Sequence, residues 1–209
     1  HPVQYSHLIA ILLNAALQFS ALVHPRWIDS AKGGYFGLYS YCAATGCPFR
    51  MLAVKVFSKG FSIAALLMLV ATIFSFLAAF SITLLILMRD RYVFLLSAST
   101  QLISALATLL ACVVYPWGWG SGKVREICLS YSYDPGVCEL GSGFILALVL
   151  VFDHFCLSLF GFMLTIKQPL RTSEIYSISV YSTKQRKKLL RSHSYHGSLH
   201  SNGSSKMAT

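Results

Sequence analysis

The stretch FSIAALLMLVATIFSFLAAFSITLLILM, residues 61–88, contains no charged side chain. A bilayer with a hydrocarbon core about 30 Å thick needs roughly 20 apolar residues of helix to be crossed. Three further stretches meet this requirement, residues 5–23, 92–115 and 143–166, and only the last carries a charged residue, Asp153. Buried helices of a water-soluble protein would show a polar face, and these stretches do not. The sequence therefore predicts four membrane-spanning helices.

The first stretch has a second interpretation, a cleaved signal peptide. No basic residue precedes it, and it is longer than the apolar region of such peptides, which is about 7 to 15 residues. Of the whole chain, 56% is hydrophobic and 11% is charged, which is a membrane composition. We therefore expect the first stretch to be a span.

Four spans put both chain ends on one side of the membrane and the loops at residues 24–60 and 116–142 on the other. Lys and Arg gather in the tail and on both sides of Asp90, between the second and third spans. Basic residues favour the cytoplasmic side, so we expect cytoplasmic termini, with residues 1–166 as a tetraspan membrane domain and residues 167–209 as a disordered, Ser-rich basic tail. The net charge of +10 has this membrane explanation, and nucleic acid is not an expected partner.

The two loops carry four cysteines, Cys42 and Cys47 in the first and Cys128 and Cys138 in the second. Disulfides form in oxidising compartments, which again places both loops outside the cytoplasm. Three connectivities are possible for four cysteines, and we favour the two pairs within loops because their sequence separation is short. Two more cysteines, Cys112 and Cys156, lie inside spans, where we expect them to be packing residues.

The loops also contain signals of local structure. Residues 23–56 are rich in β-forming residues and are broken by Gly33, Gly34 and Gly46, which predicts a small sheet. The second loop opens with the aromatic segment YPWGW, residues 115–119. Aromatic residues are enriched where helices leave the hydrocarbon, and both membrane anchoring and ligand binding are open interpretations.

The first-loop order of Trp27, then Gly37, Leu38 and Tyr39, then two cysteines resembles the signature of the claudin-like tetraspan superfamily. GGYFGLYSYC, residues 33–42, and CVVYPWGWGSGKVREIC, residues 112–128, are similar to the narrower lipoma HMGIC fusion partner-like (LHFPL) tetraspan family. The resemblance covers about residues 20–166. Its motif residues are Trp27, Gly37, Leu38, Tyr39, Tyr115, Pro116, Gly118 and Trp119.

The resemblance implies an all-α integral membrane fold: a left-handed bundle of four transmembrane helices with a small extracellular β-sheet. For some members it also implies a role as an auxiliary subunit of an ion channel or receptor.

Three polar residues are expected near the bilayer midplane, since at about 1.5 Å per helical residue Asn14, Gln101 and Asp153 reach similar depths. A charged carboxylate there costs several kcal/mol unless it is paired, protonated or hydrated. We therefore predict a polar layer that joins the first, third and fourth spans by hydrogen bonds of about 0.6 to 2 kcal/mol each. The alternative is an ion or proton path, for which a single acidic residue is too few.

No catalytic, metal or cofactor motif occurs. None of the seven histidines lies at the spacing of a zinc site, and a phosphate-binding loop and a serine nucleophile elbow are both absent from the sequence. Basic residues in the tail are expected to bind anionic lipid, with a cytoplasmic retention signal as the alternative: Lys184, Arg186, Lys187, Lys188 and Arg191.

The favoured function is a non-enzymatic accessory protein of the plasma membrane that binds another integral membrane protein, such as a channel or receptor. Small residues of the second span allow close helix contact, either with that partner or inside the bundle: Ala64, Ala65, Ala71, Ser75, Ala78 and Ala79. The alternative function is claudin-like adhesion or barrier formation between copies of the chain. A channel or transporter is disfavoured by the small number of charges within the spans.

Overall fold

A computed structural model describes residues 2–30, 33–42, 59–84, 91–167 and 181–186. The chain divides into two units, His1–Lys167 and Gln168–Thr209, and each is described by itself. The first unit contains four helices that are long and apolar enough to cross a membrane: α1 (Pro2–Val23), α2 (Lys59–Leu84), α3 (Arg91–Val114) and α5 (Ser142–Lys167). These helices confirm the four predicted spans, while the predicted end of the second span, residues 85–88, lies outside the described residues.

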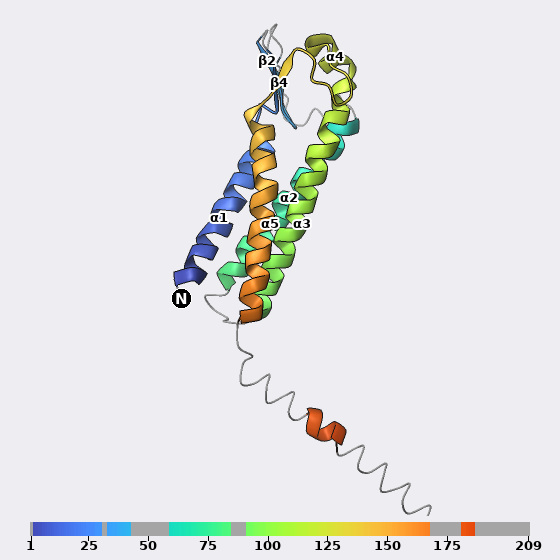
Figure 1. Ribbon diagram of the computed structural model, residues 1–209. Helices are drawn as coiled ribbons and strands as arrows, with labels where there is room; N and C mark the ends of the chain where they lie inside the picture. The colour runs from blue at the N-terminus through green and yellow to red at the C-terminus, as the bar shows by residue number, and fades with distance from the viewer. Residues whose placement is uncertain (1, 31–32, 43–58, 85–90, 168–180, 187–209) are drawn as a thin grey trace, which may run out of the picture. The chain divides into compact units, whose positions relative to one another are not determined.

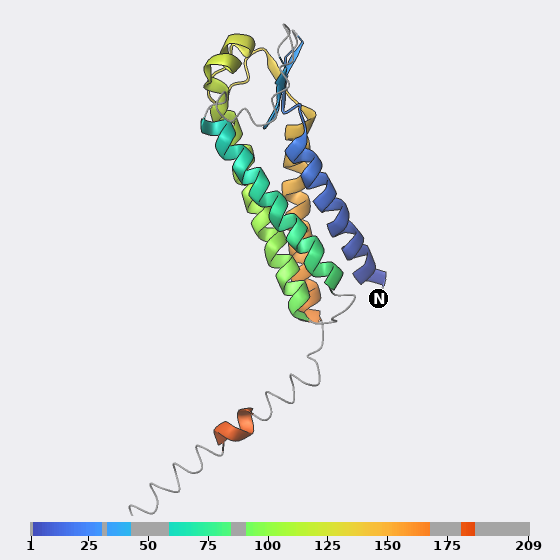
Figure 2. The ribbon, with the colours of Figure 1, turned by 180° about the vertical axis from the view of Figure 1, so that it is seen from behind.

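The four helices form a bundle in which each packs against two neighbours, in the order α1, α2, α3, α5 around the ring (Figures 1 and 2). The small residues of α2 lie on its buried side: Ala64, Ala65, Ala71, Ser75, Ala78 and Ala79. Small side chains let helix backbones approach closely. This face of α2 therefore packs inside the bundle, and the interpretation as a docking face for a partner is wrong.

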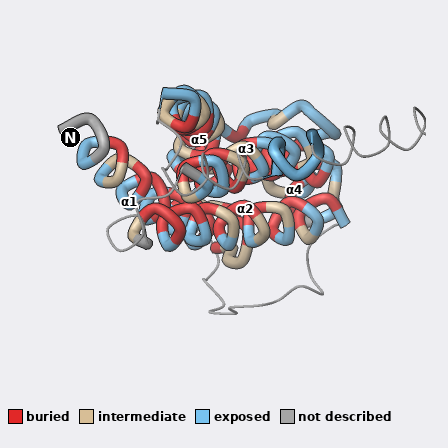
Figure 3. Tube along the Cα trace, turned by 90° about the horizontal axis from the view of Figure 1, so that it is seen from below, coloured by how far each residue is buried: buried red, intermediate tan, exposed pale blue. Residues whose placement is uncertain are grey.

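The outer faces of the helices are apolar. Figure 3 shows buried residues where the helices face one another and exposed residues around the outside. On α2 the exposed side chains include Ile63, Leu66, Ile73 and Phe80. In a membrane these residues face lipid, which explains why the sequence of this span has no polar side.

One end of the bundle carries the remaining elements, which we call the head: residues 24–30, 33–42 and 115–141. It contains a four-stranded antiparallel sheet in the order β3 (Tyr41–Cys42), β2 (Gly34–Phe36), β1 (Ile28–Ser30), β4 (Cys138–Leu140). Strand β1 pairs with β4 in the register Ile28 to Leu140. The sheet predicted in the first loop is thus present, but its edge strand β4 comes from the second loop and was not predicted.

The second loop also holds two short helices, η1 (Tyr115–Gly120) and α4 (Gly122–Cys128). A disulfide joins Cys128 at the end of α4 to Cys138 in β4, with Cα atoms 5.2 Å apart, which confirms one of the two favoured pairs. Cys42 is disulfide-bonded, and its expected partner Cys47 lies outside the described residues. Because β4 belongs to the sheet, the Cys128–Cys138 bond fastens α4 to it.

The two cysteines within spans differ in environment. Cys112 is buried among core residues, as expected, whereas Cys156 is exposed. The expectation that Cys156 packs inside the bundle is wrong, because the neighbouring positions that α5 turns inward are His154 and Ser158.

Candidate functional site

The motif residues of the two loops meet where the head joins the bundle. The Trp27 side chain is fully buried, and its Nε1 donates a hydrogen bond to the Ala21 carbonyl at the end of α1, at 3.1 Å. Its ring centroid lies 4.9 Å from that of Tyr115 and 5.8 Å from that of Phe144. Aromatic pairs at such separations add to the stabilisation from burial. Trp27 thus connects α1, η1 and α5 under the sheet.

Two tyrosines tie the sheet segment to the helices through their hydroxyl groups. The Tyr115 hydroxyl donates to the Phe36 carbonyl in β2 at 3.3 Å, and the Tyr39 hydroxyl donates to the Ala65 carbonyl in α2 at 3.0 Å. Burial raises the pKa of the Tyr39 phenol, so the neutral hydroxyl that makes this bond is the favoured form. Leu38 lies buried in the same cluster.

The motif glycines occupy points of close backbone approach. A Cβ atom on Gly37 would lie 2.7 Å from the Pro25 carbonyl oxygen, and one on Gly60 would lie 2.8 Å from the Gly118 nitrogen. Pro116 and Trp119 are buried in η1, as Gly118 is. The structure thus brings the motif residues of both loops together, and their shared role is to hold the head on the bundle.

A second group of polar side chains lies inside the bundle around His154, which is fully buried. Asn14 Nδ2 of α1 lies 3.0 Å from His154 Nδ1, and the amide oxygen Oε1 of Gln101 in α3 contacts the same nitrogen. On the other side of the ring, Nε2 lies 3.1 Å from Gln18 Oε1 and 3.2 Å from Ser104 Oγ. A neutral imidazole with its proton on Nε2 accepts from Asn14 Nδ2 and shares its one N–H between Gln18 Oε1 and Ser104 Oγ. Gln101 Oε1 then lies against Nδ1 without a hydrogen bond.

Two further bonds extend this cluster to all four spanning helices. Gln18 Nε2 donates to Thr108 Oγ1 of α3 at 3.2 Å, and Ser104 Oγ donates to the Ala71 carbonyl of α2 at 2.9 Å. The predicted layer is therefore present with Asn14 and Gln101 in it, and it includes α2, which the sequence interpretation left out. Hydrogen bonds of this kind between membrane helices contribute on average about 0.6 kcal/mol each.

Asp153, the third residue predicted for the layer, is not in it. Its side chain is exposed on α5, and His154 occupies the inward position. Successive residues of an α-helix differ by about 100° in direction, so two neighbours cannot share one face. Asp153 thus lies at the level of the polar cluster along α5, next to His154, and the prediction that its side chain joins the cluster is wrong.

The sequence does contain the signal that separates these two residues. Seven of the eight buried residues of α5, all except Phe144, recur every three or four positions: Gly143, Ala147, Leu150, His154, Ser158, Gly161 and Thr165. This small and polar stripe includes His154 and excludes Asp153, in the periodicity of a helix face. The same spacing relates Asn14 to Gln18 on α1, and Gln101 to Ser104 and Thr108 on α3. Gln18, Ser104 and Thr108 are the cluster residues that the sequence interpretation missed.

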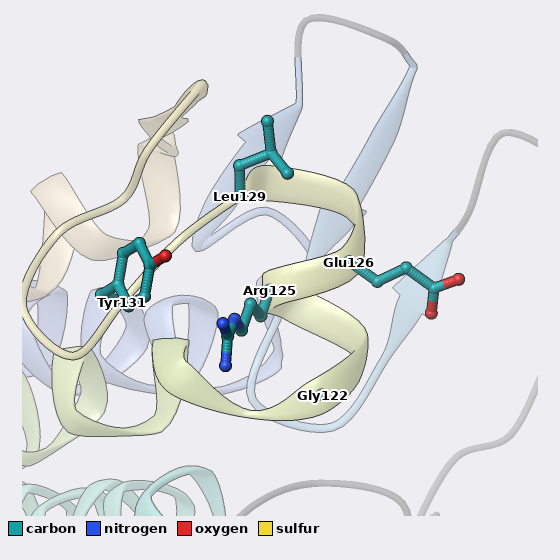
Figure 4. Close-up of a pocket in the computed structure, with 5 residues that line it drawn as sticks. All are labelled: Gly122, Arg125, Glu126, Leu129 and Tyr131. Carbon is teal, nitrogen blue, oxygen red and sulfur yellow. The ribbon is translucent and has the colours of Figure 1, made fainter.

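The head exposes large apolar side chains outside the spanning helices. Leu129, Tyr131, Tyr133 and Val137, which we call the loop surface, are each at least half exposed. Two of them, Leu129 and Tyr131, line a shallow hollow together with Gly122, Arg125 and Glu126 (Figure 4). The Arg125 guanidinium carbon lies 5.1 Å from the centroid of the Tyr131 ring, and Glu126 points away from both.

Two residues of the loop surface have left-handed backbone conformations, Leu129 with φ 53° and Tyr133 with φ 65°. Leu129 is the C-terminal cap of α4, and its N–H donates to the Arg125 carbonyl at 2.9 Å. Glycine is the usual residue at such a cap because other residues pay a steric cost there. Leu129 adopts this unfavourable conformation and exposes its side chain, so it is a candidate contact residue.

Among the described residues, no group of three or more His, Cys, Asp or Glu side chains is placed to hold a metal ion. In the tail unit, residues 181–186 form a short helix in which Lys184 and Arg186 are exposed. The other predicted lipid-binding residues, Lys187, Lys188 and Arg191, lie outside the described residues.

Comparison with known proteins decides the family. The model of the lipoma HMGIC fusion partner-like protein family matches residues 7–167. The chain belongs to this family. It is 26% identical over 168 residues to the human LHFPL tetraspan subfamily member 4 protein, with 74% of this chain and 68% of the relative covered. With human subfamily member 3 the identity is 27% over 167 residues, covering 74% and 71%.

The chicken LHFPL tetraspan subfamily member 5 protein is 26% identical over 165 residues, covering 73% of this chain and 75% of the relative. Membership of this family and four helices able to span a bilayer make the chain a multi-pass tetraspan membrane protein. The LHFPL resemblance predicted from the loop motifs is confirmed.

Proposed function

We propose that this chain is a non-enzymatic auxiliary or assembly subunit of another integral membrane protein, such as an ion channel or receptor. In this proposal the loop surface contacts the extracellular part of that partner, both termini are cytoplasmic, and the complex resides in the plasma membrane. The tail helix presents Lys184 and Arg186 to anionic lipid of the inner leaflet.

One observation carries the proposal: the loop surface, which lies outside the spanning helices, exposes apolar side chains and has an unfavourable backbone conformation at Leu129 and Tyr133. Leu129 is 65% exposed and Tyr133 is 62% exposed, and both have positive φ. Exposed apolar groups outside the membrane mark protein interaction sites. Tyrosine and arginine are each enriched where protein partners bind, and here Tyr131 and Arg125 lie side by side.

The deciding experiment separates contact from folding by the change Leu129→Gly. Glycine at φ 53° removes the steric cost of this conformation, which stabilises the fold by about 1 to 2 kcal/mol. Glycine also raises the conformational entropy of the unfolded chain, which destabilises the fold by about 0.5 to 1 kcal/mol. The fold should therefore be unaffected, within about 1 kcal/mol, while the exposed leucine side chain is lost. Tyr5→Ala is the matched control, because Tyr5 is also 65% exposed but lies near the opposite end of α1 from the head.

The measurement is mass spectrometry of proteins that co-purify with the tagged chain from native membranes in mild detergent. We expect one channel or receptor to be recovered with the wild type and with Tyr5→Ala, and to be lost with Leu129→Gly. Trp27→Ala and Cys128→Ser serve as comparisons in which the head is loosened. Recovery of only further copies of this chain, concentrated at cell contacts, would overturn the proposal and favour claudin-like adhesion.

A further inference from the structure

The outer face of α5 carries one ionisable side chain at the depth of the hydrocarbon. Asp153 lies 11 residues after Ser142 and 14 residues before Lys167, the ends of the helix. At 1.5 Å per residue these separations are about 17 and 21 Å. Since the hydrocarbon core is about 30 Å thick, Asp153 lies near its middle.

The surroundings of Asp153 on this face offer it no polar partner. The exposed residues around it on α5 are Val149, Phe152, Phe155, Cys156, Leu159 and Phe160. Within the described part of the chain, no hydrogen bond or ion pair of Asp153 is found, while the neighbouring His154 is buried in the polar cluster. Ionisable groups in membranes nearly always face a protein interior or a water-filled cavity, so this face is an incomplete protein surface.

We propose that the outer face of α5 around Asp153 docks a transmembrane helix of a different membrane protein, and that this helix carries a lysine or arginine near its midpoint. The proposal rests on the proposed function, since it supplies the membrane contact of the same partner. The Asp153 carboxylate then pairs with a basic side chain in a place from which water is excluded, and both charges are compensated.

A second copy of this chain does not fit the site. A symmetric contact through this face would place one Asp153 opposite the other, which is repulsive when both are ionised. The four spanning helices contain lysine and arginine only at their ends, namely Lys59, Arg91 and Lys167. No span can therefore offer a basic side chain to Asp153 at mid-depth, and the occupant must have another sequence.

The test uses host helices as probes: single-span Leu/Ala peptides with Lys, Leu or Glu at the central position. Each carries a cysteine one turn from the centre, because the exposed Cys156 lies one helical turn from Asp153. The full chain and one peptide are reconstituted in phosphatidylcholine vesicles, and disulfide formation at Cys156 under copper–phenanthroline oxidation is measured. We expect the Lys peptide to be captured about threefold to thirtyfold better than the Leu peptide, and the Glu peptide no better than Leu.

The preference for Lys should vanish in Asp153→Leu. The elution profile of this variant in detergent should match that of the wild type, because Asp153 makes no hydrogen bond or ion pair with the described residues. A cysteine introduced by Leu69→Cys in a Cys156→Ser background is the matched control, since Leu69 is exposed on α2 with no acidic residue on its span. Equal capture of the three peptides, a Lys preference that survives Asp153→Leu, or copies of the chain cross-linked to each other through Cys156 would each overturn the inference.

The two proposals fail in distinguishable ways. If the Lys preference is absent but the native partner is still recovered with the wild type and lost with Leu129→Gly, the α5 inference is wrong and the auxiliary-subunit proposal stands. If the preference is present but no other membrane protein co-purifies, α5 binds basic helices as inferred and the auxiliary-subunit proposal is wrong.

Discussion

Replacing His154 by leucine should destabilise the bundle, whereas the same change at the neighbouring Asp153 should not. His154 makes four side-chain contacts, with Asn14, Gln101, Gln18 and Ser104. With the imidazole proton on Nε2, the contacts with Asn14, Gln18 and Ser104 are hydrogen bonds, and at about 0.6 kcal/mol per interhelical hydrogen bond these three amount to about 1.8 kcal/mol. Asn14 and Gln101 would also be left buried without a side-chain partner, which raises the expected loss to between about 2 and 4 kcal/mol.

Asp153→Leu replaces an exposed side chain that has no partner among the described residues. It removes a charge from the lipid-facing side of α5, so we expect the free energy of unfolding to be unchanged or higher. The assay is steric trapping of the purified chain in bicelles, which measures that free energy directly. His154→Gln, which keeps a donor and an acceptor, is the intermediate case and should lose less than His154→Leu.

A decrease of 2 kcal/mol or more in the free energy of unfolding of Asp153→Leu, together with little change in His154→Leu, would refute the assignment of His154 to the inward position on α5. It would mean that α5 is rotated by about 100° from the orientation described here. Equal losses in the two variants would show that the polar cluster has no special share in the stability of the bundle.

Two further predictions concern the head. Gly60→Ala should lower stability by about 1 to 3 kcal/mol, because its Cβ would lie 2.8 Å from the Gly118 nitrogen, whereas Gly122→Ala, with nothing within 4 Å of the new atom, should be tolerated. Thermal unfolding in detergent compares the two variants, and equal losses of stability would contradict the close approach of α2 and η1. Cys138→Ser should lower stability by about 2 to 3 kcal/mol, since it opens a disulfide loop with a sequence separation of 10, and reducing agent should destabilise the wild type but have a smaller effect on the variant.

The sequence alone was sufficient for the four spans, because crossing a bilayer depends on length and apolarity along the chain. It was also sufficient for the Cys128–Cys138 pair and for the family, since both depend on local spacing and on motifs such as GGYFGLYSYC. The structural role of the motif residues could not be predicted from the sequence. That Trp27 and Tyr115 pack at 4.9 Å follows only when both loops are folded onto the same helix ends.

Only the tertiary structure decided the direction in which each polar side chain points. The choice between Asp153 and His154 depends on the rotation of α5 against α1 and α3, which the packing of small residues at Gly161 and Ala98 sets, with a new Cβ on Gly161 only 2.9 Å from that of Ala98. The pairing of β4 with β1 joins residues more than a hundred positions apart, and local propensity carries no information on such a partner. Depth in the membrane is a property of the sequence, whereas direction around a helix is a property of the neighbours it packs against.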